Sequence, residues 1–287
     1  MLQSIKDILD RPAKPFNLAD FGGLKEDEYL QDDIIMCAKC NGARMFVHNN
    51  FRVRCLCECQ AKARDDEEKA EKERERQREI EKYQKASLIG ERYKNARFAD
   101  TETGHNPSFD AAYIRCERYC GVADEVLQKG LGIYLYGDKG TGKTHLTACM
   151  ANELIQKRKQ VLFTNFAEIV RLVTDSWKKG TEKETELIAR IATIDFLFID
   201  DLGTERVQGA NGADLMLQEK MFDVLNKRYN NRKPTIFTSN HSIPELITER
   251  GFMEKTVDRI TEMSNAILKI EGDSYRMKAR AAVELPF

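Results

Sequence analysis

The stretch "GDKGTGKT", residues 137 to 144, follows the pattern G-x-x-x-x-G-K-[ST] and decides the fold of this chain. The short apolar run "LGIYLYG" (131–137) precedes it, and "HLTACMANELIQKR" (145–158), which has helical periodicity, follows it. A glycine-rich turn between a strand and a helix lets backbone N–H groups face phosphate oxygens, and the helix N-terminus adds positive potential. We therefore predict a phosphate-binding loop.

Each residue type in this loop has an expected task. The glycines allow a tight turn, Lys143 is expected to contact the β- and γ-phosphates of a nucleotide, and Thr144 to ligate Mg²⁺. The predicted nucleotide-binding residues are Gly137, Asp138, Lys139, Gly140, Thr141, Gly142, Lys143, Thr144 and His145. The alternative, a glycine-rich turn with a chance lysine, is disfavoured by the strand and helix on either side.

A second carboxylate site is needed to fix Mg²⁺ from the far side, because this ion keeps most of its waters. The run "IDFLFIDD" (194–201) supplies it, since four apolar residues lead into Asp200 and Asp201. We predict that Asp200 holds the metal through water and that Asp201 polarises the attacking water. Because Asp201 has a shorter side chain than Glu would, Glu205 is the reserve candidate for this role.

A further strand, "PTIFTSN" (234–240), ends in Asn240. If its strand neighbours the one that carries the two aspartates, the amide of Asn240 lies beside both carboxylates. That position suits a residue that positions water or senses the γ-phosphate. The predicted catalytic set from the core motifs is therefore Lys143, Asp200, Asp201 and Asn240.

The fold class follows from strands that alternate with helices. Besides the runs above, "QVLFTN" (160–165) has the pattern of a strand. Strands this apolar, separated by helices, predict an α/β fold with a parallel sheet covered on both faces. No internal repeat is visible.

Composition limits the remaining possibilities. The chain has 287 residues, 41% of them hydrophobic, and a net charge of −1, which is enough for one substantial core and a smaller module. It shows no secretory leader and no apolar run near the roughly 20 residues of a membrane span, so we expect a soluble, cytoplasmic protein. The neutral charge argues against blanket nucleic-acid binding, and any DNA site must be local.

Five of the eight cysteines form the pattern C-x₂-C-x₁₄-C-x-C-x-C, which is typical of a Zn²⁺ site in an intracellular chain. They are Cys37, Cys40, Cys55, Cys57 and Cys59, and the first four are the preferred ligands, with Cys59 a close rival. His48 could substitute, although a surface histidine is the simpler interpretation, and free thiols without metal remain the alternative. Cys116, Cys120 and Cys149 fall in helical apolar patterns and are expected to be buried thiols.

The segment after the cysteines is almost wholly charged. Residues 61 to 85 hold nine acidic and nine basic residues with no apolar heptad, which predicts a solvated helical spacer rather than a coiled coil. Residues 1 to 36 predict a short helix and loops. We therefore expect a zinc-binding module at 1–60, a charged helical linker at 61–87 and a nucleotide-binding domain at 88–287.

Together these motifs resemble the AAA+ ATPases of the helicase-loader group, the DnaC/DnaI type, with the IstB transposition helpers as near relatives. The resemblance rests on "IGERYKNARFAD" (89–100), "YGDKGTGKTHL" (136–146), "FLFIDDLGTE" (196–205), "TIFTSN" (235–240) and "KTVDRI" with "GDSYR" (255–276). Their order and spacing are more specific than any one of them apart from the phosphate loop.

The resemblance implies further roles. Arg259 of the "DRI" element would act as an arginine finger in a neighbouring subunit's ATP site, and Arg276 of "SYR" would be a sensor that contacts the nucleotide. It also implies a core without a full lid domain, since only 47 residues follow Asn240. In similar loaders a zinc-binding N-terminal module docks on the hexameric replicative helicase, so ATP, Mg²⁺, Zn²⁺, single-stranded DNA and further copies of the chain are the expected ligands and partners.

The sequence is compatible with three functions. The leading hypothesis is an ATP-dependent loader that delivers the helicase to DNA, with ATP hydrolysis as the switch. The second is a helper of DNA transposition, and the third is a P-loop kinase, for which neither an acceptor pocket nor a mobile lid is visible. The segment "DSWKKGTEK" (175–183) combines a tryptophan with lysines and is a candidate DNA contact, although a solvated loop is nearly as good an interpretation.

Overall fold

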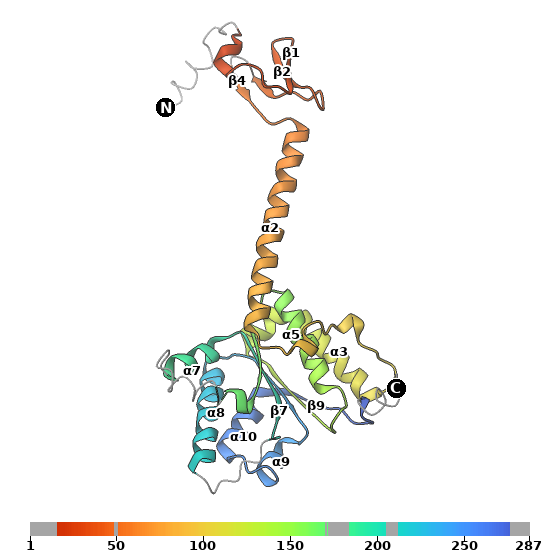
Figure 1. Cartoon of the computed structure of the whole chain (residues 1–287), viewed down its shortest axis with the longest axis vertical. Coiled ribbons are helices and arrows are strands. Elements are labelled where there is room, and N and C mark those ends of the chain that lie inside the picture. The colour runs from red at the N-terminus through yellow and green to blue at the C-terminus, as the bar shows by residue number, and fades with distance from the viewer. Residues whose placement is uncertain (1–15, 49–50, 170, 172–183, 205–211, 276–287) are drawn as a thin grey trace, which may run out of the picture. The chain divides into compact units, whose positions relative to one another are not determined.

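The computed structural model describes residues 16–48, 51–169, 171, 184–204 and 212–275 of the 287 (Figure 1). It separates into two compact units, residues 1–77 and 78–287. None of the helices within these described ranges is long and apolar enough to cross a membrane.

The first unit contains two antiparallel hairpins. Its elements are the 3₁₀ turn η1 (Leu18–Phe21) and the strands β1 (Glu28–Gln31), β2 (Ile34–Cys37), β3 (Met45–His48) and β4 (Phe51–Arg54), paired β1 with β2 and β3 with β4. The prediction of only a short helix and loops before residue 37 is wrong, because β1 and β2 lie there. Asp32 and Asp33 both have positive φ, and this two-residue turn joins the strands.

Helix α2 (Glu58–Ala86) contains nearly all of the charged segment. Its described side chains are exposed or partly exposed except Ile80, which packs in the core of the second unit. Pairs such as Arg64 and Glu68, 3.1 Å apart and one helical turn from each other, lie along its surface. The predicted solvated helix is thus present, and the division into two units falls within it.

The second unit is built on a five-stranded parallel sheet. Its strands are β5 (Gly132–Tyr136), β6 (Val161–Asn165), β7 (Phe196–Leu202), β8 (Thr235–Ser239) and β9 (Ser264–Lys269), in the order β6-β7-β8-β5-β9. All four neighbouring pairs are parallel, which confirms the predicted α/β class. Because β8 lies between β7 and β5, the segments that follow these three strands meet at one edge.

Helices cover both faces of this sheet (Figure 1). They are α3 (Pro107–Gly121), α4 (Ala123–Lys129), α5 (Lys143–Gln156), α7 (Glu184–Thr193), α8 (Gly212–Asn230), α9 (Ile243–Thr248) and α10 (Glu254–Met263), with the short turns η2 (Glu91–Tyr93) and η3 (Phe98–Asp100). Alternate strand residues divide between the faces. Phe196 and Phe198 pack with α3 and α5, whereas Leu197 and Ile199 pack with α7, α8 and α10.

Between Asn240 and Tyr275 the described structure contains α9, α10 and β9, as the sequence predicts, and no helical lid domain. The segment that follows β9 instead lies against the phosphate loop. The backbone N–H of Ile270 donates to the carbonyl of Tyr136 (2.8 Å), and that of Tyr275 donates to the carbonyl of Gly140 (3.0 Å).

Candidate functional site

The predicted phosphate loop joins β5 to α5, as its sequence requires. Gly137, Gly140 and Gly142 have φ values of 141°, 84° and 94°, which residues other than glycine rarely adopt. A Cβ on Gly137 would lie 2.0 Å from the carbonyl oxygen of Ile270, so that glycine is needed for space as well. The loop therefore leads into the N-terminus of a 14-residue helix, an arrangement suited to phosphate.

Lys143 is the first residue of α5, and its side chain is buried against the loop. Its Nζ donates to the carbonyls of Gly137 and Asp138, both at 2.7 Å. The ammonium group is thus held inside the turn formed by the loop, where a phosphate group would meet it. This position fits the role predicted for the lysine.

Asp200, near the end of β7, lies beside the N-terminal turn of α5. Its Oδ1 accepts hydrogen bonds from the hydroxyl of Thr144 at 3.0 Å and from the hydroxyl of Thr238 at 2.5 Å. Burial raises the pKa of Asp200 above its usual value, although these two hydrogen bonds oppose the shift. The hydroxyl of Thr144 and the carboxylate of Asp200 are hard oxygen donors, so the pair fits Mg²⁺.

Asp201 is the next residue of β7, and its side chain is exposed. The β7–β8 register shifts between Ile199 and Leu202, and Asp201 has a φ of 55°, so this irregularity re-aims its side chain. Its backbone N–H donates to the Thr238 hydroxyl (2.8 Å), and its Oδ1 accepts from the amide of Asn240 (2.9 Å). The structure thus brings Asn240 to Asp201 directly, while Asp200 is bonded to Thr238 instead.

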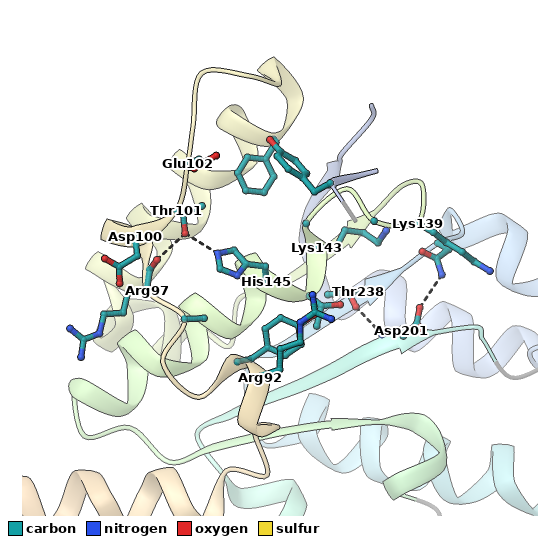
Figure 2. A pocket seen from close by; sticks show the side chains of 18 of the residues that line it. Arg92, Arg97, Asp100, Thr101, Glu102, Lys139, Lys143, His145, Asp201 and Thr238 are labelled. Atoms are coloured by element: carbon teal, nitrogen blue, oxygen red, sulfur yellow. Dashed lines mark hydrogen bonds between the residues drawn. The ribbon is translucent and has the colours of Figure 1, made fainter. Parts of the chain in front are cut away.

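Most of these groups line a cavity of about 760 Å³ (Figure 2), although Asp200 lies behind Thr144 and Thr238 and is not part of the lining. One wall carries Lys143, Thr144, Asp201, Thr238 and Asn240. The opposite wall comes from the segment between α2 and α3 and includes Arg92, Tyr93, Asn95, Ala96, Arg97 and Thr101. A space of this size suits a nucleotide with its phosphates at the first wall.

His145 connects the two walls. Its Nε2 lies 3.0 Å from the hydroxyl of Thr101, which in turn donates to the carbonyl of Arg97 at 2.8 Å (Figure 2). A threonine hydroxyl has one proton, so while it donates to the Arg97 carbonyl it can only accept from Nε2 of His145. Burial lowers the pKa of His145, so the neutral ring is favoured.

Several predicted residues do not join this cavity. Arg259 lies on α10, stacked over the ring of Tyr229 at 4.2 Å and paired with Glu262, and it is not among the residues that line the cavity. Arg276, Glu205 and the candidate DNA segment 175–183 lie outside the described residues.

Sequence reasoning missed other parts of the site. Thr238 bonds to both aspartates, and its position two residues before Asn240 on a parallel strand was the signal that could have found it. Tyr275 lines the cavity, and its ring centroid lies 5.9 Å from that of Phe109. No local sequence pattern predicts this contact between distant segments. For the wall formed by residues 92–101, the sequence signal was the resemblance of "IGERYKNARFAD" to the helicase-loader group.

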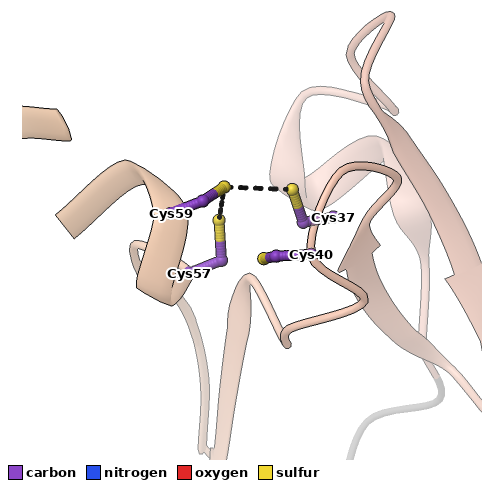
Figure 3. Close-up of side chains that lie close together, drawn as sticks. All are labelled: Cys37, Cys40, Cys57 and Cys59. Carbon is purple, nitrogen blue, oxygen red and sulfur yellow. Dashed lines mark hydrogen bonds between the residues drawn. The ribbon is translucent and has the colours of Figure 1, made fainter. Parts of the chain in front are cut away.

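A second cluster lies in the first unit, where four thiols face one another (Figure 3). Cys37 and Cys40 flank the turn after β2, and Cys57 and Cys59 lie at the start of α2. All four sulfur atoms lie within 4.8 Å of one another. Zn²⁺ with four sulfurs at about 2.3 Å has sulfur–sulfur edges of about 3.8 Å, so the spacing fits this metal.

Cys59 belongs to this cluster and Cys55 does not, so the geometry favours Cys59 over the expected ligand Cys55. Cys55 still continues β4, because its N–H donates to the carbonyl of Arg44 (2.9 Å), and its exposed thiol lies 3.7 Å from the carbonyl of Ala43. The helix begins three residues later, and its first turn brings Cys59 to 3.3 Å from Cys57. The side chain of His48 lies outside the described residues.

The thiols of the cluster differ electrostatically. Burial raises the pKa of Cys57, but hydrogen bonds from Arg44 and from the backbone of Gln60 outweigh it and lower the pKa to about 6. Contact with Cys57 raises the pKa of Cys59 to about 12. The Arg44 guanidinium thus favours the thiolate form of Cys57, which is the form that binds metal. Cys116, Cys120 and Cys149, by contrast, are buried as expected.

The parallel sheet, the phosphate loop and the paired carboxylates with Asn240 define a P-loop ATPase of the AAA+ class. The sequence model of the IstB-like ATP binding protein family matches residues 66–283, and the chain belongs to this family. The match begins after the four clustered cysteines, so it covers the ATPase unit and not the cluster.

The relatives agree with this assignment. Replicative helicase loader DnaC of Escherichia coli (strain K12) is 26% identical over 180 residues, which are 60% of this chain and 70% of DnaC. Replicative helicase loader DnaI of Bacillus subtilis (strain 168) is 28% identical over 204 residues, 68% of this chain and 61% of DnaI. A crystal structure of the DnaC helicase loader superposes with a TM-score of 0.52 at 26% identity, covering 63% of this chain and all of that one.

Proposed function

We propose that this protein is an ATP-dependent loader that binds a hexameric replicative helicase and single-stranded DNA and delivers the helicase to DNA. The observation that carries the proposal is the likeness of the ATPase unit to a solved helicase loader over that chain's whole length. In this proposal ATP serves as a switch, and the cavity beside the phosphate loop offers its nucleotide site.

The site supports hydrolysis with defined roles for its residues. Mg²⁺ would bind at Thr144 and Asp200 and neutralise charge on the phosphates, while Lys143 contacts them. Asp201 orients and polarises the attacking water, and the 2.9 Å bond from Asn240 fixes the carboxylate that does so. The Thr238 hydroxyl donates to the Asp200 carboxylate and accepts from the backbone N–H of Asp201, so it helps to position both residues.

An active site in this account needs a second copy of the chain. Arg259 lies on α10 with its guanidinium over Tyr229 and does not line its own cavity, which fits a role at a neighbour's nucleotide. An arginine in that position stabilises the charge that develops on the transferred phosphoryl group. We therefore propose a homo-oligomer in which each Arg259 completes the next site, and Arg276 acts as a sensor within its own.

The first unit is proposed to bind Zn²⁺ at Cys37, Cys40, Cys57 and Cys59 and to dock on the helicase. The four sulfurs form a set that suits structural zinc, and a metal-stapled module can present a fixed surface to a partner. The exposed charged helix α2 then serves as the tether to the ATPase.

A helper of DNA transposition is the second candidate, which the match to the IstB-like family favours. Such a helper would share the ATPase cavity and its residues. It would act with a transposase and would have no effect on helicase activity. The cysteine cluster favours loading, because it lies ahead of residues 66–283, which the IstB-like family model matches.

Helicase-dependent unwinding of a circular single-stranded template, coated with single-strand binding protein, tests the proposal. The protein should stimulate unwinding when ATP is present, and Lys143→Ala protein should not, because it loses the phosphate contacts. Asp201→Asn protein should load once and fail to recycle.

Unwinding that is unchanged by the wild-type protein at any concentration, with the helicases of several candidate hosts, would contradict the proposal. ATP turnover stimulated by a transposase and not by a helicase would favour the second candidate.

A further inference from the structure

Arg44 is a buried charged side chain next to the cysteine cluster. It immediately precedes β3, and its backbone N–H donates to the carbonyl of Ile35 at 2.7 Å. Only 2% of its side chain is exposed. A buried guanidinium is costly unless its donors are all engaged, so its partners indicate what it does.

All five N–H groups of Arg44 have a partner. One edge of the guanidinium meets both carboxylate oxygens of Asp27, at 2.9 and 2.6 Å, and Nη1 also donates to Glu28 at 3.2 Å. The remaining two donors meet sulfur. Nε lies 3.4 Å from Sγ of Cys57, and Nη2 lies 3.1 Å from Sγ of Cys37.

The two sulfurs come from the two halves of the cluster. Cys37 belongs to the turn after β2, and Cys57 precedes α2, so one planar group spans both segments that must meet around a metal. The bidentate contact with Asp27 fixes the plane of the guanidinium, and the fixed plane sets where the two sulfurs lie. A lysine could not do this, because its ammonium is a point donor on a flexible stem.

We propose that Arg44 is the positioning residue of the metal centre, which donates to the Cys37 and Cys57 thiolates and offsets their charge. This inference rests on the proposed zinc site. Four thiolates and one Zn²⁺ leave a net charge of −2, and a buried cation in contact with two of the sulfurs stabilises that charge. Arg44 therefore slows metal loss and lowers the nucleophilicity of the two sulfurs that it contacts.

The simpler interpretation is that Arg44 only forms a structural ion pair with Asp27 and Glu28. Arg54 provides the matched control, because it shares Glu28 with Arg44. Its Nη1 donates to Glu28 at 2.7 Å, and its other donors meet the carbonyls of Phe21 (2.9 Å) and Gly23. Its described contacts include no sulfur. Loss of Arg54 thus perturbs the same carboxylate and leaves the cluster alone.

The test is Zn²⁺ affinity, measured on the full chain by competition with a chromophoric chelator, for the wild type, Arg44→Met, Arg44→Lys and Arg54→Met. Arg44→Met should weaken binding by about 10- to 100-fold, as losing a hydrogen bond to a metal ligand typically does. Arg44→Lys should fall between, and Arg54→Met should stay within about threefold of the wild type.

Alkylation of the zinc-loaded proteins, mapped by mass spectrometry, supplies a second measurement. Cys37 and Cys57 should react faster in Arg44→Met and Arg44→Lys, while the rates at Cys40 and Cys59 change less. A merely structural arginine would raise all four rates together. Should Arg44→Met fail to fold, Arg44→Lys carries the same comparison.

Equal weakening by Arg44→Met and Arg54→Met, or no weakening by either, overturns the inference and leaves the zinc site standing. A wild-type protein that binds no Zn²⁺ is a different result, since it contradicts the proposed metal site itself.

Discussion

The two units of this chain stabilise their folds in different ways. In the described part of the chain before α2, the buried apolar side chains apart from cysteine are Ile35 and Met45. Buried beside them are Cys37, Cys57 and the charged Arg44. The ATPase unit instead buries two extensive apolar clusters, one on each face of its sheet.

The free energy of folding therefore has a different source in each unit. A module with so few buried apolar groups cannot offset the conformational entropy of its chain by hydrophobic burial alone. A structural metal can make up that deficit, whereas the ATPase unit needs none. The two units should therefore respond separately to metal removal and to changes at the nucleotide site.

The largest expected effect is loss of the metal. Cys37→Ser combined with Cys40→Ser should abolish Zn²⁺ binding and unfold the module, because structural zinc supplies about 10–16 kcal/mol to such small folds. Hydrogen exchange should then be fast in β1–β4 and unchanged in β5–β9. Cys55→Ser is the control and should keep its zinc, since that thiol lies outside the cluster. Zinc loss in Cys55→Ser alone would break the assignment of ligands.

The next effect concerns the arginine finger. Arg259→Ala should bind ATP normally yet hydrolyse it about 10³-fold more slowly, because the transition-state charge on a neighbour's phosphates is no longer stabilised. Lys255→Ala on the same helix is the control. Mixing Arg259→Ala with Lys143→Ala protein should restore part of the turnover, measured as phosphate release, since an intact site then meets an intact arginine. Absence of rescue at every ratio would place Arg259 in its own subunit's site.

Substitution of the water-polarising carboxylate should slow ATP hydrolysis by a factor comparable to that of Arg259→Ala. Asp201→Asn should retain ATP affinity and lose about 10²- to 10⁴-fold in hydrolysis, as expected when a general base is removed. Lys143→Ala should show the opposite pattern, with affinity lost first, which titration of a fluorescent nucleotide will measure. If Glu205→Gln abolishes turnover and Asp201→Asn does not, the roles of these two residues must be exchanged.

The smallest effect should come from Thr238. Thr238→Val removes the hydroxyl that bonds to Asp200 and to the backbone of Asp201, and should weaken Mg²⁺ binding by about tenfold. Thr235→Val, at the other end of β8, is the matched control and should leave Mg²⁺ dependence unchanged. Equal effects of the two variants on Mg²⁺ dependence would point to a general loss of stability.

The parts that the sequence predicted are those set by local pattern. The strands that lead to Gly137, Asp200 and Asn240 are short apolar runs, and their ends meet because the strands are parallel and adjacent in the order β7-β8-β5. The same logic placed the phosphate loop at a helix N-terminus. Such features depend on residues close in the chain.

The parts that it could not predict depend on where elements begin and on contacts between distant segments. Whether Cys55 or Cys59 joins the cluster depends on the start of α2 at Glu58, and helix boundaries are poorly specified by sequence. Arg44 has no pattern that links it to Cys57, 13 residues away. The positive φ of Asp201 follows from the irregular pairing of β7 with β8.

We propose that the two compact units must be linked in one chain to load a helicase. A protease site inserted in the exposed part of α2, near residue 70, allows the same protein to be assayed before and after cleavage in the unwinding assay described above. Linkage through α2 keeps one unit at high effective concentration near the other, and cleavage removes this advantage. The account predicts that cleavage leaves zinc content and ATP hydrolysis intact and abolishes stimulated unwinding, and stimulation that survives complete cleavage would contradict it.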